Sequence, residues 1–152
     1  MKWIVPHAAL CLAAAFSPSA IAAEIAPDDV QFADAAVPSL VSDKGGNADA
    51  GRKAFIDRSL GNCLACHAVS ALSSELFHGT VGPSLDGAAG RWSTEQLRAI
   101  VVNAKEVFGP DTVMPGFYTL KVGADVVKTH KGKTILTAQQ VEDMVAFLGT
   151  LK

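Results

Sequence analysis

The sequence predicts a mostly α-helical domain with long irregular loops, preceded by an extended N-terminal arm. Two capping boxes mark helix starts, because Ser93 is followed three residues later by Gln96, and Thr137 likewise by Gln140. Residues 62–92 are rich in Gly, Ser and Pro, which is typical of irregular structure. A small domain with so much loop has a weak core of its own, so we expect a large apolar group at its centre.

The C-terminal helix has the clearest pattern along the chain. Its apolar residues recur at the helical spacing i, i+3, i+4, i+7 and i+10, at Val141, Met144, Val145, Leu148 and Leu151. The helix after the first capping box carries a weaker stripe, at Leu97, Ile100, Val101 and Ala104. A third helix is predicted over 50–56. There Gly51 and Phe55 would pack against the stripe around Leu148, the glycine allowing close approach. A weak alternation over 122–135 predicts a small hairpin.

Residues 1–23 have the pattern of a secretory signal peptide. Lys2 is followed by an apolar stretch and then by small residues that favour cleavage near Ala22 or Ala23. The alternative is an uncleaved membrane anchor, but the apolar stretch is shorter than the roughly 20 residues that a spanning helix needs. We therefore expect export to the periplasm and no membrane contact after cleavage.

The remaining chain divides into two parts. Residues 24–48 contain Pro27, Pro38 and paired glycines without a helical period, which predicts an extended arm ending in a flexible joint. Residues 49–152 form the predicted domain. The formal net charge of the whole chain is −2, and losing Lys2 with the signal makes it more acidic, which argues against a nucleic-acid partner.

Export also limits what the cysteines can do. Cys11 lies in the signal segment, so Cys63 and Cys66 remain, as a disulfide, a metal site or a haem attachment site. His67 follows directly, and Cys-x-x-Cys-His is the attachment motif of c-type haem. The two sulfurs would join the two vinyl groups, and His67 would bind the iron. A thioredoxin-type site needs a preceding strand and a structural zinc site needs more ligands, and the sequence offers neither.

A haem that only transfers electrons needs a sixth iron ligand, for which methionine and histidine are the usual donors. Met114 is the favoured candidate, because it lies in an irregular loop and is followed by Pro115, which stiffens that loop. Met144 belongs to the apolar stripe of the last helix, where a core position is expected. His78 and His130 remain the alternatives. Coordination by one histidine and one methionine would raise the reduction potential.

Pro83 and Arg91 are candidate haem-site residues beyond the iron ligands. The carbonyl of Pro83 could accept a hydrogen bond from the ring nitrogen of His67 that faces away from the iron, which would fix the ring. The alternative is an ordinary loop proline. Arg91, or Trp92 beside it, could bond a haem propionate, the alternatives being a surface arginine and a core tryptophan.

With these residues considered, the sequence resembles the SoxX family, the mono-haem c-type cytochrome subunits of SoxAX complexes. The resemblance rests on residues 61–67, 82–87, 97–98, 101–105, 111–118 and 137–148, with a further match at 35–40. It covers nearly the whole mature chain. Its more specific elements are the Met114-Pro115 loop and the stretch Asn103-Ala104-Lys105, since all c-type cytochromes share the attachment motif.

The resemblance implies a class I cytochrome c-like fold with long loops around one covalently bound haem c. It also implies a SoxA-like partner in a heterodimer, a transient SoxYZ-like carrier and a downstream cytochrome c. In that family the complex acts as an L-cysteine S-thiosulfotransferase, which joins thiosulfate to a carrier cysteine and releases two electrons. The chemistry takes place at a cysteine-ligated haem on SoxA, so this chain would be the non-catalytic electron acceptor. It has no cysteine after Cys66 that could act instead.

Two other functions stay open. A free-standing electron shuttle would dock transiently on several partners, and the arm at 24–48 argues weakly against it, because such an arm could instead wrap a permanent partner. A haem sensor would need an open iron site, which Met114 in a stiff loop disfavours.

Overall fold

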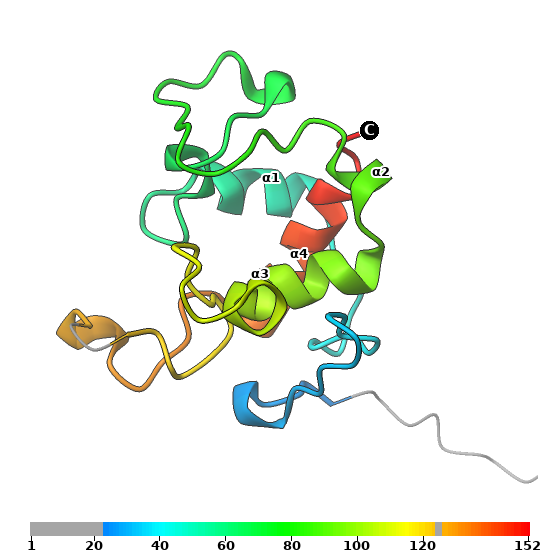
Figure 1. Ribbon diagram of the computed structural model, residues 1–152, viewed down its shortest axis with the longest axis vertical. Coiled ribbons are helices and arrows are strands. Elements are labelled where there is room, and N and C mark those ends of the chain that lie inside the picture. The colour runs from blue at the N-terminus through cyan, green and yellow to red at the C-terminus, as the bar shows by residue number, and fades with distance from the viewer. Residues whose placement is uncertain (1–22, 124–125) are drawn as a thin grey trace, which may run out of the picture.

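The computed structural model describes residues 23–123 and 126–152, and the predicted signal segment, apart from Ala23, lies outside them. The α-helices are α1 (Ala48–Ile56), α2 (Ala88–Arg91), α3 (Thr94–Phe108) and α4 (Ala138–Leu148). Short 3-10 turns are η1 (Pro27–Asp29), η2 (Cys63–Ala65), η3 (Ser70–Leu72) and η4 (Lys128–His130). The described residues form no β-strand, so the prediction of a mostly helical fold with long loops is confirmed (Figure 1).

Helices α1 and α4 pack closely because glycine lies at their contact. A Cβ atom added to Gly51 would lie 1.9 Å from the carbonyl oxygen of Asp143, so no other residue fits without displacing a helix. The rings of Phe55 and Phe147 meet edge to face nearby, with centroids 5.5 Å apart. The predicted packing of Gly51 and Phe55 against the last helix is therefore confirmed, and the backbone approached is that of Asp143.

Both predicted capping boxes are present. The side chain of Ser93 accepts from the backbone NH of Gln96, and that of Thr137 accepts from the NH of Gln140, while each glutamine returns a bond to its cap. The predicted stripe of the C-terminal helix is buried, although its last member follows the end of α4; the five residues are Val141, Met144, Val145, Leu148 and Leu151. These local bonds and this stripe fix α4 in the core beside α1 and α3.

The arm packs on its own chain. Val37 and Val41 are 1% and 0% exposed and belong to the hydrophobic core. The backbone NH of Val37 donates to the carbonyl of Glu95 at 3.0 Å, at the start of α3. The segment predicted as an extension able to wrap a partner thus contributes Val37 and Val41 to the core of this chain.

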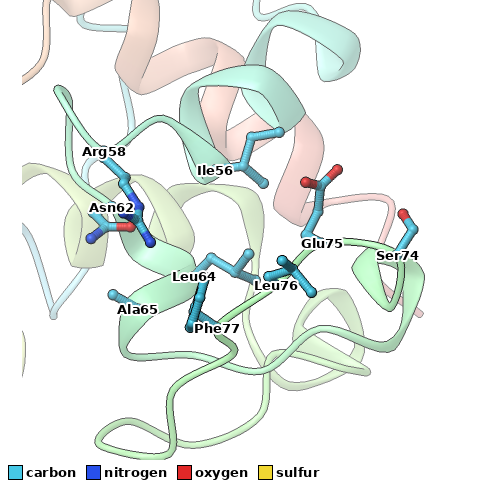
Figure 2. Close-up of a pocket in the computed structure, with 9 residues that line it drawn as sticks. All are labelled: Ile56, Arg58, Asn62, Leu64, Ala65, Ser74, Glu75, Leu76 and Phe77. Carbon is cyan, nitrogen blue, oxygen red and sulfur yellow. The ribbon is translucent and has the colours of Figure 1, made fainter.

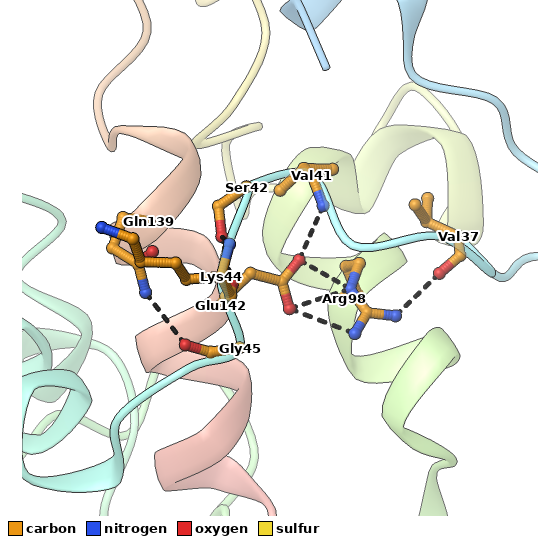
Figure 3. A network of polar contacts seen from close by, with 8 residues as sticks. All are labelled: Val37, Val41, Ser42, Lys44, Gly45, Arg98, Gln139 and Glu142. Atoms are coloured by element: carbon orange, nitrogen blue, oxygen red, sulfur yellow. Dashed lines mark hydrogen bonds and ion pairs between the residues drawn. The ribbon is translucent and has the colours of Figure 1, made fainter. Parts of the chain in front are cut away.

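A buried ion pair joins the arm to α3 and α4. Arg98 of α3 and Glu142 of α4 are 4% and 2% exposed, and Arg98 Nε lies 2.8 Å from Glu142 Oε1. Arg98 Nη1 donates to the Val37 carbonyl at 2.9 Å, and the Val41 NH donates to Glu142 Oε1 at 2.8 Å (Figure 3). Because every charged partner is hydrogen-bonded, the pair can remain buried, and it fixes the arm at two points.

The hairpin predicted over 122–135 is wrong within the described residues. Residues 126–135 contain the 3-10 turn η4 and a left-handed glycine at Gly132 (φ +70°) instead. The NH groups of Ile135 and Leu136 both donate to the Phe117 carbonyl, at 3.0 and 2.9 Å. The segment therefore bonds to an earlier loop rather than to itself. Across the described residues, none of the helices has the length and apolar character needed to span a membrane.

Candidate haem-binding site

Turn η2 brings Cys63, Cys66 and His67 together. Asn62 enters the turn in a left-handed conformation (φ 46°, ψ 47°), and the Cys63 carbonyl then accepts from the NH groups of Cys66 at 3.1 Å and His67 at 2.9 Å. The two cysteines form no disulfide with each other, and Cys63 is half-buried whereas Cys66 is exposed. Before haem is attached, burial raises the pKa of the Cys63 thiol to about 12. The turn presents two thiols and an imidazole, which is the donor set of a c-type haem site.

His67 is held by the two residues Gly82 and Pro83. Its Nδ1 lies 2.8 Å from the carbonyl oxygen of Pro83, the contact expected from the sequence. Since a carbonyl oxygen can only accept, Nδ1 carries the proton and Nε2 keeps its lone pair for a metal. A Cβ atom on Gly82 would lie 2.3 Å from His67 Cε1, so only glycine lets the ring lie there. The residues around His67 therefore fit an iron-ligating imidazole.

Backbone bonds attach the segment carrying Pro83 to the attachment turn. The NH of Gly79 donates to the Leu64 carbonyl and that of Gly82 to the Cys66 carbonyl, both at 2.9 Å. A Cβ on Gly79 would lie 1.8 Å from Ala65 O, which shows how closely the two segments run. The acceptor for His67 is thus placed by the same turn that carries His67.

Asp86 and Arg91 fix the end of this segment. Asp86 Oδ1 accepts from the Ser70 NH at 2.8 Å, and Asp86 Oδ2 accepts from Ser70 Oγ at 2.7 Å. These bonds, and to a smaller degree Ser84 and the Arg91 charge, lower the pKa of Asp86. Arg91 donates to the carbonyls of Ser84 at 3.0 Å and Asp86 at 2.6 Å. Arg91 therefore braces the loop after Pro83, and its predicted bond to a propionate stays a prediction. Trp92 is half-buried, with its ring edge-on to Phe108 at 5.8 Å.

Met114 lies half-buried against the core in the loop after α3. The next residues are fixed, because Phe117 and Tyr118 donate their NH groups to carbonyls of α3 and are 5% and 2% exposed. Phe117 also approaches the attachment turn: a Cβ on Gly61 would lie 2.7 Å from Phe117 Cε1 and 3.4 Å from Cys63 Sγ. The Met114 loop and the attachment turn therefore border the same region.

Two of the alternative iron ligands, His78 and Met144, are occupied by other contacts. His78 Nε2 lies 2.9 Å from the Leu72 carbonyl, and its Nδ1 lies 3.5 Å from the Val69 NH, so its ring braces the loop backbone. Met144 is 1% exposed within α4, a core position as expected. His130 lies in η4 beside an open cavity of about 210 Å³ whose lining is otherwise apolar. Of the two methionines considered, Met114 alone lies in a loop near the attachment turn.

A second open pocket, of about 330 Å³, lies beside the attachment turn (Figure 2). Leu64 and Ala65, the residues between the two cysteines, line it together with Leu76 and Phe77. The latter two side chains are 75% and 74% exposed. The Arg58 guanidinium lies over the Phe77 ring at 5.4 Å. Cys63, Cys66, His67 and Met114 are not among the residues that line this pocket.

Sequence reasoning missed two parts of the site. Gly82 could have been found from its place beside Pro83, since a ring packed on backbone leaves no room for a side chain. Asn103 and Lys105 belong to a stretch typical of the SoxX family, but no motif or periodicity in the sequence indicates what their side chains do. In the structure both contact the Met114 loop.

Comparisons with known proteins identify the family of the chain. Residues 48–152 match the family described as cytochrome c. A solved structure, SoxXA from P. pantotrophus, has a chain that is 42% identical, with a TM-score of 0.79, covering 86% of this chain and 99% of that chain. A comparison with curated protein sequences found no match. The chain therefore belongs to the cytochrome c family, carries one covalently bound haem c for electron transfer, and within that family is a member of the SoxX group.

Proposed function

We propose that this chain is the electron-accepting haem subunit of a periplasmic heterodimeric cytochrome complex of the SoxAX type. The complex would couple conjugation of thiosulfate to a carrier-protein cysteine with release of electrons. The observation that carries the proposal is the 42% identity over 99% of a chain of the SoxXA structure. The partners would be a SoxA-like subunit, a transient SoxYZ-like carrier and a downstream cytochrome c.

The chain's own residues support an accepting role rather than a catalytic one. Its cysteines are Cys11, Cys63 and Cys66, of which the first lies in the proposed signal peptide and the others form the attachment motif. No thiol is then left to receive sulfur. The conjugation would take place on the SoxA-like subunit, and this chain would be inactive alone.

His67 and Met114 are the proposed iron ligands. The Pro83 carbonyl would keep His67 in the tautomer that leaves Nε2 unprotonated, and the distance of 2.8 Å supports this role. Haem c supplies a one-electron centre whose potential is raised by a thioether ligand. Ligation by both residues would keep small molecules off the iron, which suits electron transfer.

Replacement of Met114 by alanine tests the ligation. We expect the ferrous haem to bind carbon monoxide readily and the ferric haem to lose its near-infrared sulfur-to-iron band. Met144→Leu, a volume-conserving change in the core, is the matched control and should keep the wild-type spectrum. An unchanged spectrum and unchanged carbon monoxide binding in the Met114 variant would refute the assignment.

Purification from the native periplasm tests the partnership. We expect the chain to elute with a second, cysteine-ligated cytochrome, and thiosulfate conjugation to require both chains and a carrier thiol. N-terminal sequencing of the purified chain tests cleavage near Ala22 or Ala23. Recovery as a monomer without a second cytochrome would contradict the subunit proposal while leaving the haem assignment intact.

The arm does not discriminate between a subunit and the alternative of a free-standing shuttle. The arm, whose suggested use was to wrap a permanent partner, has Val37 and Val41 in the core of its own chain. It therefore gives no support to either function. The shuttle would reduce or oxidise several partners with bimolecular rates that fall with salt, whereas a subunit would pass electrons inside a stable complex.

A further inference from the structure

Lys105, in the last turn of α3, bonds the loop that leads to Met114. Its Nζ lies 3.0 Å from the Pro110 carbonyl and 2.5 Å from the Thr112 carbonyl. An ammonium group has three donors and no acceptor, so both contacts are charge-assisted hydrogen bonds from Lys105 to the loop backbone. Thr112 comes directly before Val113 and Met114, and Pro110 lies two residues earlier. Lys105 thus fixes the N-terminal side of the ligand loop.

A break in α3 fixes the other side. Asn103 leaves the helical conformation (φ −156°, ψ 95°) inside α3. The carbonyls of Val101 and Val102, just before the break, accept from the NH groups of Phe117 at 3.3 Å and Tyr118 at 3.0 Å. These donors come three and four residues after Met114. One helix therefore bonds the loop both before and after the proposed ligand.

Close packing supports the second attachment. A Cβ atom on Gly116 would lie 2.7 Å from Asn103 Oδ1 and 2.5 Å from Thr119 Cγ2, so the loop runs directly against the break. Between the two attachments the chain has no regular structure, and Val113 is 81% exposed. The loop from Pro110 to Phe117 is short and bonded at both ends. The backbone at Met114 therefore has few conformations available to it, although no regular structure holds it directly.

We propose that the end of α3 acts as a bracket for the Met114 loop, and that Lys105 is a positioning residue that limits how often the Met114 sulfur leaves the haem iron. The inference rests on the proposed ligation by Met114 and goes beyond it. Lys105 touches neither haem ligand. It acts by holding the backbone from which Met114 projects.

The consequence is measurable because carbon monoxide binds ferrous iron only when the sulfur has left. Its association rate is then proportional to the fraction of molecules with Met114 off the iron. Loss of two charge-assisted hydrogen bonds at an exposed position shifts the equilibrium between bound and dissociated Met114 by about fivefold. Removing the Lys105 ammonium should therefore raise the association rate by about fivefold.

The experiment uses the full-length holoprotein with Lys105→Met, Lys105→Arg and Lys121→Met. Carbon monoxide association to ferrous haem and the near-infrared band of ferric haem are measured for each. Lys121 is an exposed lysine after the same loop, so its variant controls for loss of a surface charge. We expect about fivefold faster association for Lys105→Met, with Lys105→Arg and Lys121→Met within about twofold of wild type.

Each outcome decides between the two proposals. An association rate for Lys105→Met within twofold of wild type overturns the bracket, provided Met114→Ala binds carbon monoxide rapidly. If Met114→Ala behaves as wild type, the ligation itself is wrong and the bracket fails with it. Thermal unfolding distinguishes a local effect on the Met114 loop from a general loss of structure. The bracket predicts a faster carbon monoxide association with little change in the midpoint of thermal unfolding. If Lys105→Met lowers the midpoint strongly, the same rates are compared in Lys105→Gln, which keeps a neutral donor.

Discussion

His67 Nδ1 lies 2.8 Å from the carbonyl oxygen of Pro83, and this contact joins the attachment turn to a segment sixteen residues further along the chain. Gly82, the residue before that proline, also donates its NH to the carbonyl of Cys66 at 2.9 Å. The ring and its acceptor are therefore parts of one hydrogen-bonded unit. Displacing either the ring or its carbonyl acceptor should change how His67 binds the iron.

Gly82→Ala should weaken the proximal ligation. The new Cβ would lie 2.3 Å from His67 Cε1 and 2.6 Å from Nδ1, so the ring has to move away from Pro83. Overpacking of this kind costs about 2 kcal/mol of unfolding free energy, and loss of the carbonyl partner lowers the basicity of the imidazole. Redox titration and denaturant unfolding of the holoprotein check both effects. Gly90→Ala is the control, because its Cβ would meet nothing within 4 Å; equal effects in both variants would contradict the prediction.

Asp86→Asn should remove an acid-sensitive part of the stability. Hydrogen bonds from Ser70 lower the pKa of Asp86 below its ordinary value of 3.8. The carboxylate therefore stabilises the fold fully above that ordinary value, and the contribution disappears as the pH falls through the lowered folded value. Unfolding midpoints across this acid range should drop more steeply in wild type than in the variant. Asp43→Asn, at an exposed position, should keep the wild-type slope, and a wild-type slope in Asp86→Asn would refute the prediction.

Gly51→Ala should destabilise the contact between α1 and α4. A Cβ would lie 1.9 Å from the backbone oxygen of Asp143 and 2.8 Å from Phe147 Cβ, so the two helices must separate. We expect a loss of about 3 kcal/mol in denaturant unfolding. Gly149→Ala places its Cβ no closer than 3.4 Å to a neighbouring atom and should change stability little. Similar losses in the two variants would show that close packing at Gly51 is not the cause.

Arg98→Met should be far more costly than the loss of a surface arginine. It would leave the Glu142 carboxylate buried without its charged partner, at a cost of about 3–5 kcal/mol. Arg52 pairs with Glu75 at 3.6 Å, with side chains 40% and 34% exposed, so Arg52→Met should cost less than about 1 kcal/mol. Denaturant unfolding compares them, and proteolysis should cut the Arg98 variant first near Val37. If the arm of the Arg98 variant resists proteolysis as well as that of wild type, Arg98 does not hold the arm in place.

The features predicted correctly from sequence were those set by neighbouring residues. Each capping box depends on residues three apart, such as Ser93 and Gln96, and the stripe of α4 depends on a repeat within eleven residues. The attachment turn follows from a five-residue motif. The Pro83 contact is longer in range, but the chemistry of a ligating histidine calls for such an acceptor.

The features that were missed depend on residues far apart in sequence. The residues around Asn103 have an ordinary helical pattern, so the sequence gives no sign that the helix breaks there. Hydrogen bonds from the Phe117 and Tyr118 NH groups compensate for the break, and sequence patterns could not place that loop. Arg98 and Glu142 are charged and would be expected outside, yet they lie 44 residues apart in a buried pair. The hairpin over 122–135 failed for the same reason, since Ile135 found its acceptor at Phe117 rather than across a turn.

The fastening of the arm has a consequence for the order of folding. The Val41 NH and Glu142 Oε1 are 101 residues apart in sequence, and Asn47 bonds Asp143 at a similar separation. The first segment of the domain therefore cannot be secured until the last helix has formed, and closing so large a loop is entropically slow. The attachment turn at Cys63 lies inside this loop. Closure of the two ends therefore encloses the part of the chain that carries the attachment turn.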